Sequence, residues 1–91
     1  MALDPRHTLA HNQLGIASAM AGDISVARDH FRAAVEADDE NAEALFNLAR
    51  ALDQTGSPAP ARRHYERFLE VAGLEYAEQV SLAHQRLREN R

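Results

Sequence analysis

The sequence contains no cysteine and no tryptophan, and aromatic residues make up only 5% of its 91 positions. Without cysteine, neither a disulfide nor a thiolate metal site can form. Hydrophobic residues still make up 45% of the chain, and alanine is the commonest of them. A chain of this length forms one small domain, so its core has to be built by close packing of small side chains.

The chain also has no long apolar segment. No run approaches the roughly 20 residues that span a membrane, and residues 1–5 lack the charged and apolar regions of a signal peptide. These absences argue against membrane insertion and predict a cytoplasmic location, although a longer parent protein could be exported.

Basic residues are few and of one kind. All ten are arginine, none is lysine, and the formal net charge is −4. The use of arginine is compatible with a GC-rich bacterial genome. A nucleic-acid partner requires a basic patch that neutralises phosphates, so this charge balance argues against one.

Residues suited to catalysis or metal binding are dispersed along the chain. Nucleophilic catalysis needs a nucleophile, a base and an orienting group that converge in a pocket, and the serines are scattered. His7 and His11 stand one helical turn apart, but the sequence places no third ligand beside them. We therefore expect no enzymatic activity, no metal ion and no cofactor.

What the sequence does contain is a period of 34 residues. A leucine followed by a small residue recurs at Leu14-Gly15, Leu48-Ala49 and Leu82-Ala83. The same offset relates Gly22 to Gly56, Ala27 to Ala61, His30 to His64 and Phe31 to Tyr65. Periods of about 20 to 50 residues are typical of stacked-repeat architectures.

Apolar residues at helical spacing predict five helices. The first, from Thr8 to Ala21, is expected to bury a stripe of four residues, namely Ala10, Leu14, Ala17 and Ala21. Gly22 ends it, and Asp23 is expected to cap a second helix that buries Val26, Ala27, Phe31, Ala34 and Val35.

The other three helices are expected at 42–54, from Pro58 to about Ala72, and at about 75–89. Ser57 is expected to cap the fourth helix, whose first position suits Pro58 because a proline there loses no helical hydrogen bond. Gly73 is expected to end this helix in the left-handed conformation.

These residues resemble the tetratricopeptide repeat family, whose signature has a Leu-Gly pair, a small residue about 12 positions on and an aromatic four further on. The first repeat, about 8–41, matches at Leu14, Gly15, Ala27, Phe31 and Ala34. The second, about 42–75, matches at Leu48, Ala49, Ala61 and Tyr65. The resemblance implies an all-α fold, a right-handed superhelical stack of antiparallel helix pairs.

Both ends of the chain suggest an incomplete stack. Residues 1–5 look like the tail of an earlier repeat, and the helix at about 75–89 has the Leu-small pair of a first helix but no partner helix. Its polar residues suit a terminal cap, which repeat arrays require. A single domain over 1–91 that belongs to a larger protein or complex is therefore expected.

The resemblance also implies a function, because in this family the first helices of successive repeats line a concave groove that holds a peptide or a helix. At the free positions of these helices we expect an apolar strip flanked by amides and by an arginine. The expected groove residues are Asn12, Gln13, Ile16, Met20, Glu43, Phe46, Asn47, Arg50, Val80 and His84. Phe46 and Ile16 could instead only cover the neighbouring helices.

The sequence thus predicts a non-catalytic scaffold that binds a protein or peptide. Two alternatives stay open at this point. The incomplete stack could join copies of the chain into weak homo-oligomers, or the chain could be the accessory domain of a larger enzyme. Neither the fold nor the groove names the partner.

Overall fold

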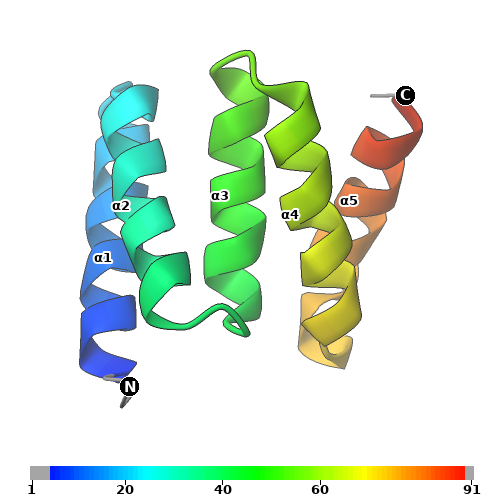
Figure 1. Cartoon of the computed structure of the whole chain (residues 1–91), viewed down its shortest axis with the longest axis horizontal. Helices are drawn as coiled ribbons and strands as arrows, with labels where there is room; N and C mark the ends of the chain where they lie inside the picture. The colour runs from blue at the N-terminus through cyan, green and yellow to red at the C-terminus, as the bar shows by residue number, and fades with distance from the viewer. Residues whose placement is uncertain (1–4, 90–91) are drawn as a thin grey trace.

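The computed structural model describes residues 5–89. In this part of the chain five α-helices and one short 3-10 helix follow one another, with no strand between them (Figure 1). The helices are α1 (Pro5–Met20), α2 (Ile24–Ala37), α3 (Ala42–Gln54), α4 (Pro58–Val71), η1 (Leu74–Tyr76) and α5 (Ala77–Glu89). The predicted all-α class with five α-helices is confirmed. Most of the predicted repeat tail at 1–5 lies outside the described residues.

The helices form a stack of antiparallel pairs. α1 packs against α2, α3 packs against α4, and the two pairs meet through α2 and α3. α5 follows at the far end and contacts α4 through a much smaller surface (Figure 1). None of the described helices is both long and apolar enough to cross a bilayer.

The turns inside the two helix pairs have the same geometry. Gly22 and Gly56 have φ angles of 89° and 81°, a region that favours glycine because it has no Cβ. The Asp23 amide donates to the Ser18 carbonyl at 2.9 Å, and the Ser57 amide donates to the Leu52 carbonyl at 2.8 Å. These bonds close α1 and α3 in the same way, so the turn residues that share the 34-residue offset also share a structure.

The N-terminal caps differ from those expected. The side chains of Asp23 and Ser57 make no capping hydrogen bond, so this prediction is wrong for both. Asn41 caps α3 instead, because its Oδ1 accepts a hydrogen bond from the Ala44 amide at 2.9 Å. A side-chain cap satisfies one of the amides that a helix start leaves without a partner.

The connection into the last helix also differs. α4 ends at Val71, and Gly73 is extended, with φ −91° and ψ −175°, rather than left-handed. The segment Leu74–Tyr76 then forms η1, so α5 begins at Ala77 instead of Glu75. Because this turn lacks the closure seen after α1 and α3, α5 is joined to the stack by a different geometry.

α3 forms the centre of the core. Eight of its thirteen residues are buried, more than in any other described helix. Three aromatic rings from α3 and α4 gather beside it: the Phe46 centroid lies 5.1 Å from Phe68 and 6.0 Å from Tyr65. Aromatic pairs at such distances add to the stability that burial provides.

In the first helix pair, α1 and α2 approach each other closely at Gly15. A Cβ built on Gly15 would collide with the ring of Phe31, which is only 4% exposed. Glycine therefore lets the backbone of α1 rest on this ring.

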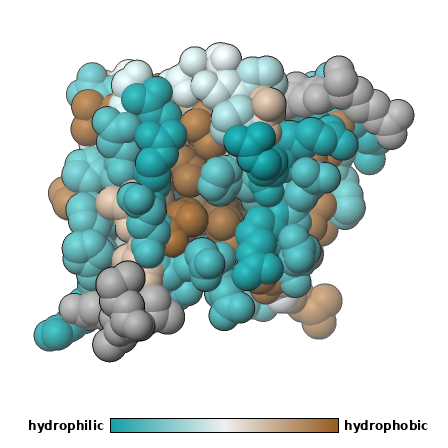
Figure 2. Space-filling model, viewed as in Figure 1, coloured by the Kyte–Doolittle hydropathy of each residue, from teal (hydrophilic) through white to brown (hydrophobic). Residues whose placement is uncertain are grey.

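The expected buried stripe of α1 is wrong. Ala10, Leu14, Ala17 and Ala21 are all exposed, and so is Val26 on α2. The stripe 34 residues later is buried: Leu48 is 1% exposed where Leu14 is 50% exposed. The reason is the position in the stack, because α2 packs against α3 on one side whereas no described helix precedes α1. Figure 2 shows apolar side chains at the edge of the molecule where Figure 1 places α1.

Candidate functional site

Three hollows lie on the surface over α1, α3 and α5, which we call the concave face. Their volumes are about 400, 310 and 280 Å³, near the lower end of the range for ligand pockets. Arg50 of α3 lines all three. The hollows therefore form one surface arranged around a single exposed arginine.

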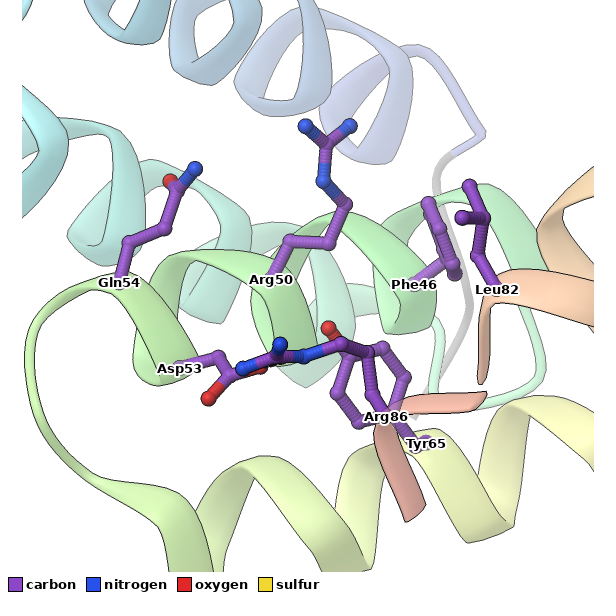
Figure 3. A pocket seen from close by; sticks show the side chains of 7 residues that line it. All are labelled: Phe46, Arg50, Asp53, Gln54, Tyr65, Leu82 and Arg86. Atoms are coloured by element: carbon purple, nitrogen blue, oxygen red, sulfur yellow. Dashed lines mark hydrogen bonds and ion pairs between the residues drawn. The ribbon is translucent and has the colours of Figure 1, made fainter. Parts of the chain in front are cut away.

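The largest hollow lies between α3, α4 and α5 (Figure 3). Arg86 of α5 donates from Nε to Asp53 Oδ2 of α3 at 2.7 Å. The Asp53 side chain is 12% exposed, so this ion pair is better shielded from water than the other pairs in the described chain. In Figure 3 the Arg86 side chain passes over Tyr65, and Arg50 points away from this pair.

The same hollow perturbs two titratable groups. Burial raises the pKa of Tyr65 to about 12, and the neighbouring Asp53 carboxylate adds to the shift. The hydrogen bond and charge of Asp53 raise the pKa of Arg86. Both groups are therefore held in the protonated form that they already have at neutral pH.

The second hollow is mainly apolar and lies between α1, α2 and α3. Ile16, Met20 and Ile24 contribute apolar walls, and Phe31 lies at the same site. Ile16 and Met20 are 37% and 84% exposed. This hollow can accept an apolar side chain against its apolar walls, with Arg50 at its edge toward the other hollows.

The third hollow joins the first two along α3. Glu43, Phe46 and Asn47 line it together with Ile16, Tyr76 and Gln79. The guanidinium of Arg50 lies 5.8 Å from the centroid of Phe46, within cation–π distance. No acidic side chain of the described residues forms an ion pair with Arg50.

The structure brings half of the predicted groove residues together at these hollows with exposed or partly exposed side chains. They are Ile16, Met20, Glu43, Asn47 and Arg50. Gln13 and His84 are exposed but line none of the three hollows. Val80 is half-buried and packs against the core.

Asn12 and Phe46 require a correction, because their side chains are not free. Asn12 is 4% exposed, and its Oδ1 accepts a hydrogen bond from Asn47 Nδ2 at 3.1 Å. Phe46 is 5% exposed, and its ring belongs to the aromatic cluster of the core. Of the two roles considered for Phe46, the structure favours the covering one, with only an edge at the hollows.

Four residues outside the expected groove set line the largest of these hollows, namely Gln54, Tyr65, Leu82 and Arg86. Leu82 has the same repeat position as Leu48, which is 1% exposed, but Leu82 is 48% exposed. Ala83 is the buried residue of α5, so the helix turns the other member of its Leu-small pair inward. The offset between Asp53 and Arg86, close to one repeat length, was the available signal.

Three of the five histidines, His7, His11 and His30, form a cluster that lines none of the three hollows. His11 Nδ1 lies 3.3 Å from His30 Nδ1, and the rings of His7 and His11 are 4.5 Å apart. Across the described residues, no group of three or more metal-ligating side chains has an arrangement that could hold a metal ion.

Comparison with known proteins agrees with this geometry. Residues 12–75 match the family model of the tetratricopeptide repeat. This range begins within α1 and ends within η1. It therefore covers most of the pair α1 and α2 and all of the pair α3 and α4. A search of curated proteins gave no match.

Proposed function

Because the chain belongs to the tetratricopeptide repeat family, whose repeats generally mediate contacts between proteins, we propose that it is a non-catalytic scaffold that binds a peptide or a helix on its concave face. The observation that carries this proposal is the row of connected hollows around Arg50. Partly exposed apolar side chains there adjoin polar ones, as in surfaces that anchor a peptide side chain and hold its backbone.

A random peptide library displayed on phage tests the proposal. Peptides that bind the immobilised wild-type protein are selected. Their affinities are then measured for the wild type and for Ile16→Gln. Ile16 lines two of the hollows, so a polar side chain there should weaken binding about tenfold. Val26→Gln is the matched control, because Val26 is 48% exposed on α2 and lines none of the hollows.

Equal affinities of Ile16→Gln, Val26→Gln and wild type for every selected peptide would contradict binding at the concave face. Circular dichroism of both variants checks that the fold is intact. Because each substitution replaces an exposed aliphatic residue, both should unfold within about 0.5 kcal/mol of the wild type.

One observation favours self-assembly as a second candidate function. The exposed stripe of α1 has the same character as Ala44, Leu48 and Ala51, which are 0–2% exposed on α3, the helix that packs against the preceding pair. A second copy that covers this stripe would bury apolar surface that is now in water.

Sedimentation velocity over a wide concentration range tests self-assembly. The proposal expects a size that rises with concentration and a monomer at all concentrations for Leu14→Glu, since a carboxylate is costly to bury in an apolar contact. A wild-type protein that stays monomeric at the highest concentration would contradict it. A role as the accessory domain of a larger enzyme stays a prediction.

A further inference from the structure

We infer that the peptide bound at the concave face carries an acidic side chain, flanked by apolar residues, whose carboxylate pairs with Arg50. This inference rests on the proposed function and specifies the chemistry of the partner. It starts from the position of Arg50, which is exposed and lines all three hollows. All three hollows border this guanidinium, so it is within reach of a peptide bound in any of them.

Arg50 forms no salt bridge with an acidic side chain of the described residues. The other arginine of the concave face, Arg86, is paired with Asp53 at 2.7 Å and with Glu89 at 3.2 Å. Arg50 has the Phe46 ring 5.8 Å from its guanidinium carbon instead of a carboxylate. A guanidinium held against an aromatic face keeps its N–H groups available, and their fork matches a carboxylate.

The surroundings of Arg50 define the neighbouring residues of the peptide. On one side lie Ile16 and Met20, and on the other lies Leu82, all of them at least 37% exposed. Apolar side chains of the peptide can cover them. Because hollows lie on both sides of Arg50, the acid is expected within the peptide, since a terminal carboxylate would leave one hollow empty.

The charges on the concave face favour a peptide with one acidic residue over a peptide with several. Glu43 is exposed on the same face of α3, seven residues before Arg50, and lines the third hollow. Seven residues of helix correspond to about 10 Å, or about three residues of an extended peptide. A second acid at that distance would face the Glu43 carboxylate in a molecule whose net charge is already −4.

A charge reversal tests the inference. The same peptide library is selected on the wild type, on Arg50→Glu and on the control Arg63→Glu, whose arginine is exposed on α4 and lines none of the hollows. We expect the wild type and the control to select one fixed acidic position between apolar residues. Arg50→Glu should select lysine or arginine at that position.

Affinity measurements complete the test. A selected peptide, synthesised with an amidated C-terminus to remove the terminal carboxylate, should bind Arg50→Gln at least about tenfold more weakly than the wild type. Its Asp→Asn or Glu→Gln counterpart should lose affinity for the wild type but not for Arg50→Gln.

The outcomes separate the inference from the proposed function. The inference is overturned, and the proposed function stands, if the selected peptides bind Ile16→Gln more weakly than the wild type but show no preference for an acidic residue. The same holds if Arg50→Glu selects the same peptide sequences as the wild type. Loss of binding on amidation shows a terminal carboxylate and also overturns it. If Ile16→Gln weakens no selected peptide, both fail.

Discussion

Individual residues decide how closely the helices approach and which side chains are left for binding. Gly15 makes room for Phe31, and Asn12 is held by Asn47. Arg86 is held by Asp53, whereas Arg50 is left exposed. The task of each of these side chains thus depends on which neighbour is present.

Replacing Gly15 with alanine should destabilise the protein. The added methyl group meets the Phe31 ring. Overpacking of this kind costs about 1–3 kcal/mol, and after a gain of about 1 kcal/mol in helix propensity the net loss reaches about 2 kcal/mol. Thermal unfolding followed by circular dichroism should show a Tm lowered by about 4–8 °C per kcal/mol. In a Phe31→Leu background the same substitution should cost much less, and an equal cost in both backgrounds would contradict the contact.

Tyr65 should make stability depend on alkaline pH. Its pKa is raised to about 12, first by burial and then by Asp53, so the folded protein holds this proton more tightly than the unfolded chain, in which tyrosine titrates near about 10. The resulting stabilisation is complete below about pH 10 and is lost as pH rises to about 12.

Ultraviolet absorbance measures this directly, because the chain has only two tyrosines. One tyrosinate signal should appear near pH 12 and should persist in Tyr76→Phe but vanish in Tyr65→Phe. Two tyrosines that both titrate near pH 10 in the folded protein would contradict the shielding of Tyr65.

Whole helices show why part of this structure could be predicted and part could not. The bounds of α3 agree with the expected 42–54, because the apolar spacing and the breakers at both ends are local features. The burial of Leu14 and Leu82 depends on neighbouring helices: Leu14 has no described helix before it, and Leu82 belongs to a helix that η1 joins to the stack in a new way. A periodic sequence indicates the same environment for both as for Leu48, and only the assembled stack shows that Leu48 alone is buried.

Helix caps give a prediction at this scale. Asn41→Ala removes the hydrogen bond to the Ala44 amide and should cost about 1 kcal/mol. Ser57→Ala is the matched control, because the Ser57 side chain makes no capping bond, and it should change stability by less than about 0.5 kcal/mol. Urea unfolding compares the two, and an equal loss for both variants would contradict the assignment of the cap.

At the scale of the whole molecule, the stack provides two surfaces that its sequence alone does not separate. One is the concave face with Arg50 at its centre, and the other is the apolar outer stripe of α1. The family match and the helix order make the concave face predictable as a region. The residues that line it are less predictable. Asn12 and Phe46 were expected there but are buried, whereas Leu82 and Arg86 of α5 line its largest hollow.

The most direct test of binding at the concave face is amide chemical-shift mapping with a peptide selected from the phage library. The largest changes should fall on residues that line the hollows, such as Ile16, Asn47 and Arg50, whereas Val26 on α2 and Arg63 on α4 should be unaffected. Changes that centre on the outer stripe of α1, or on the outward surfaces of α2 and α4, would contradict the account.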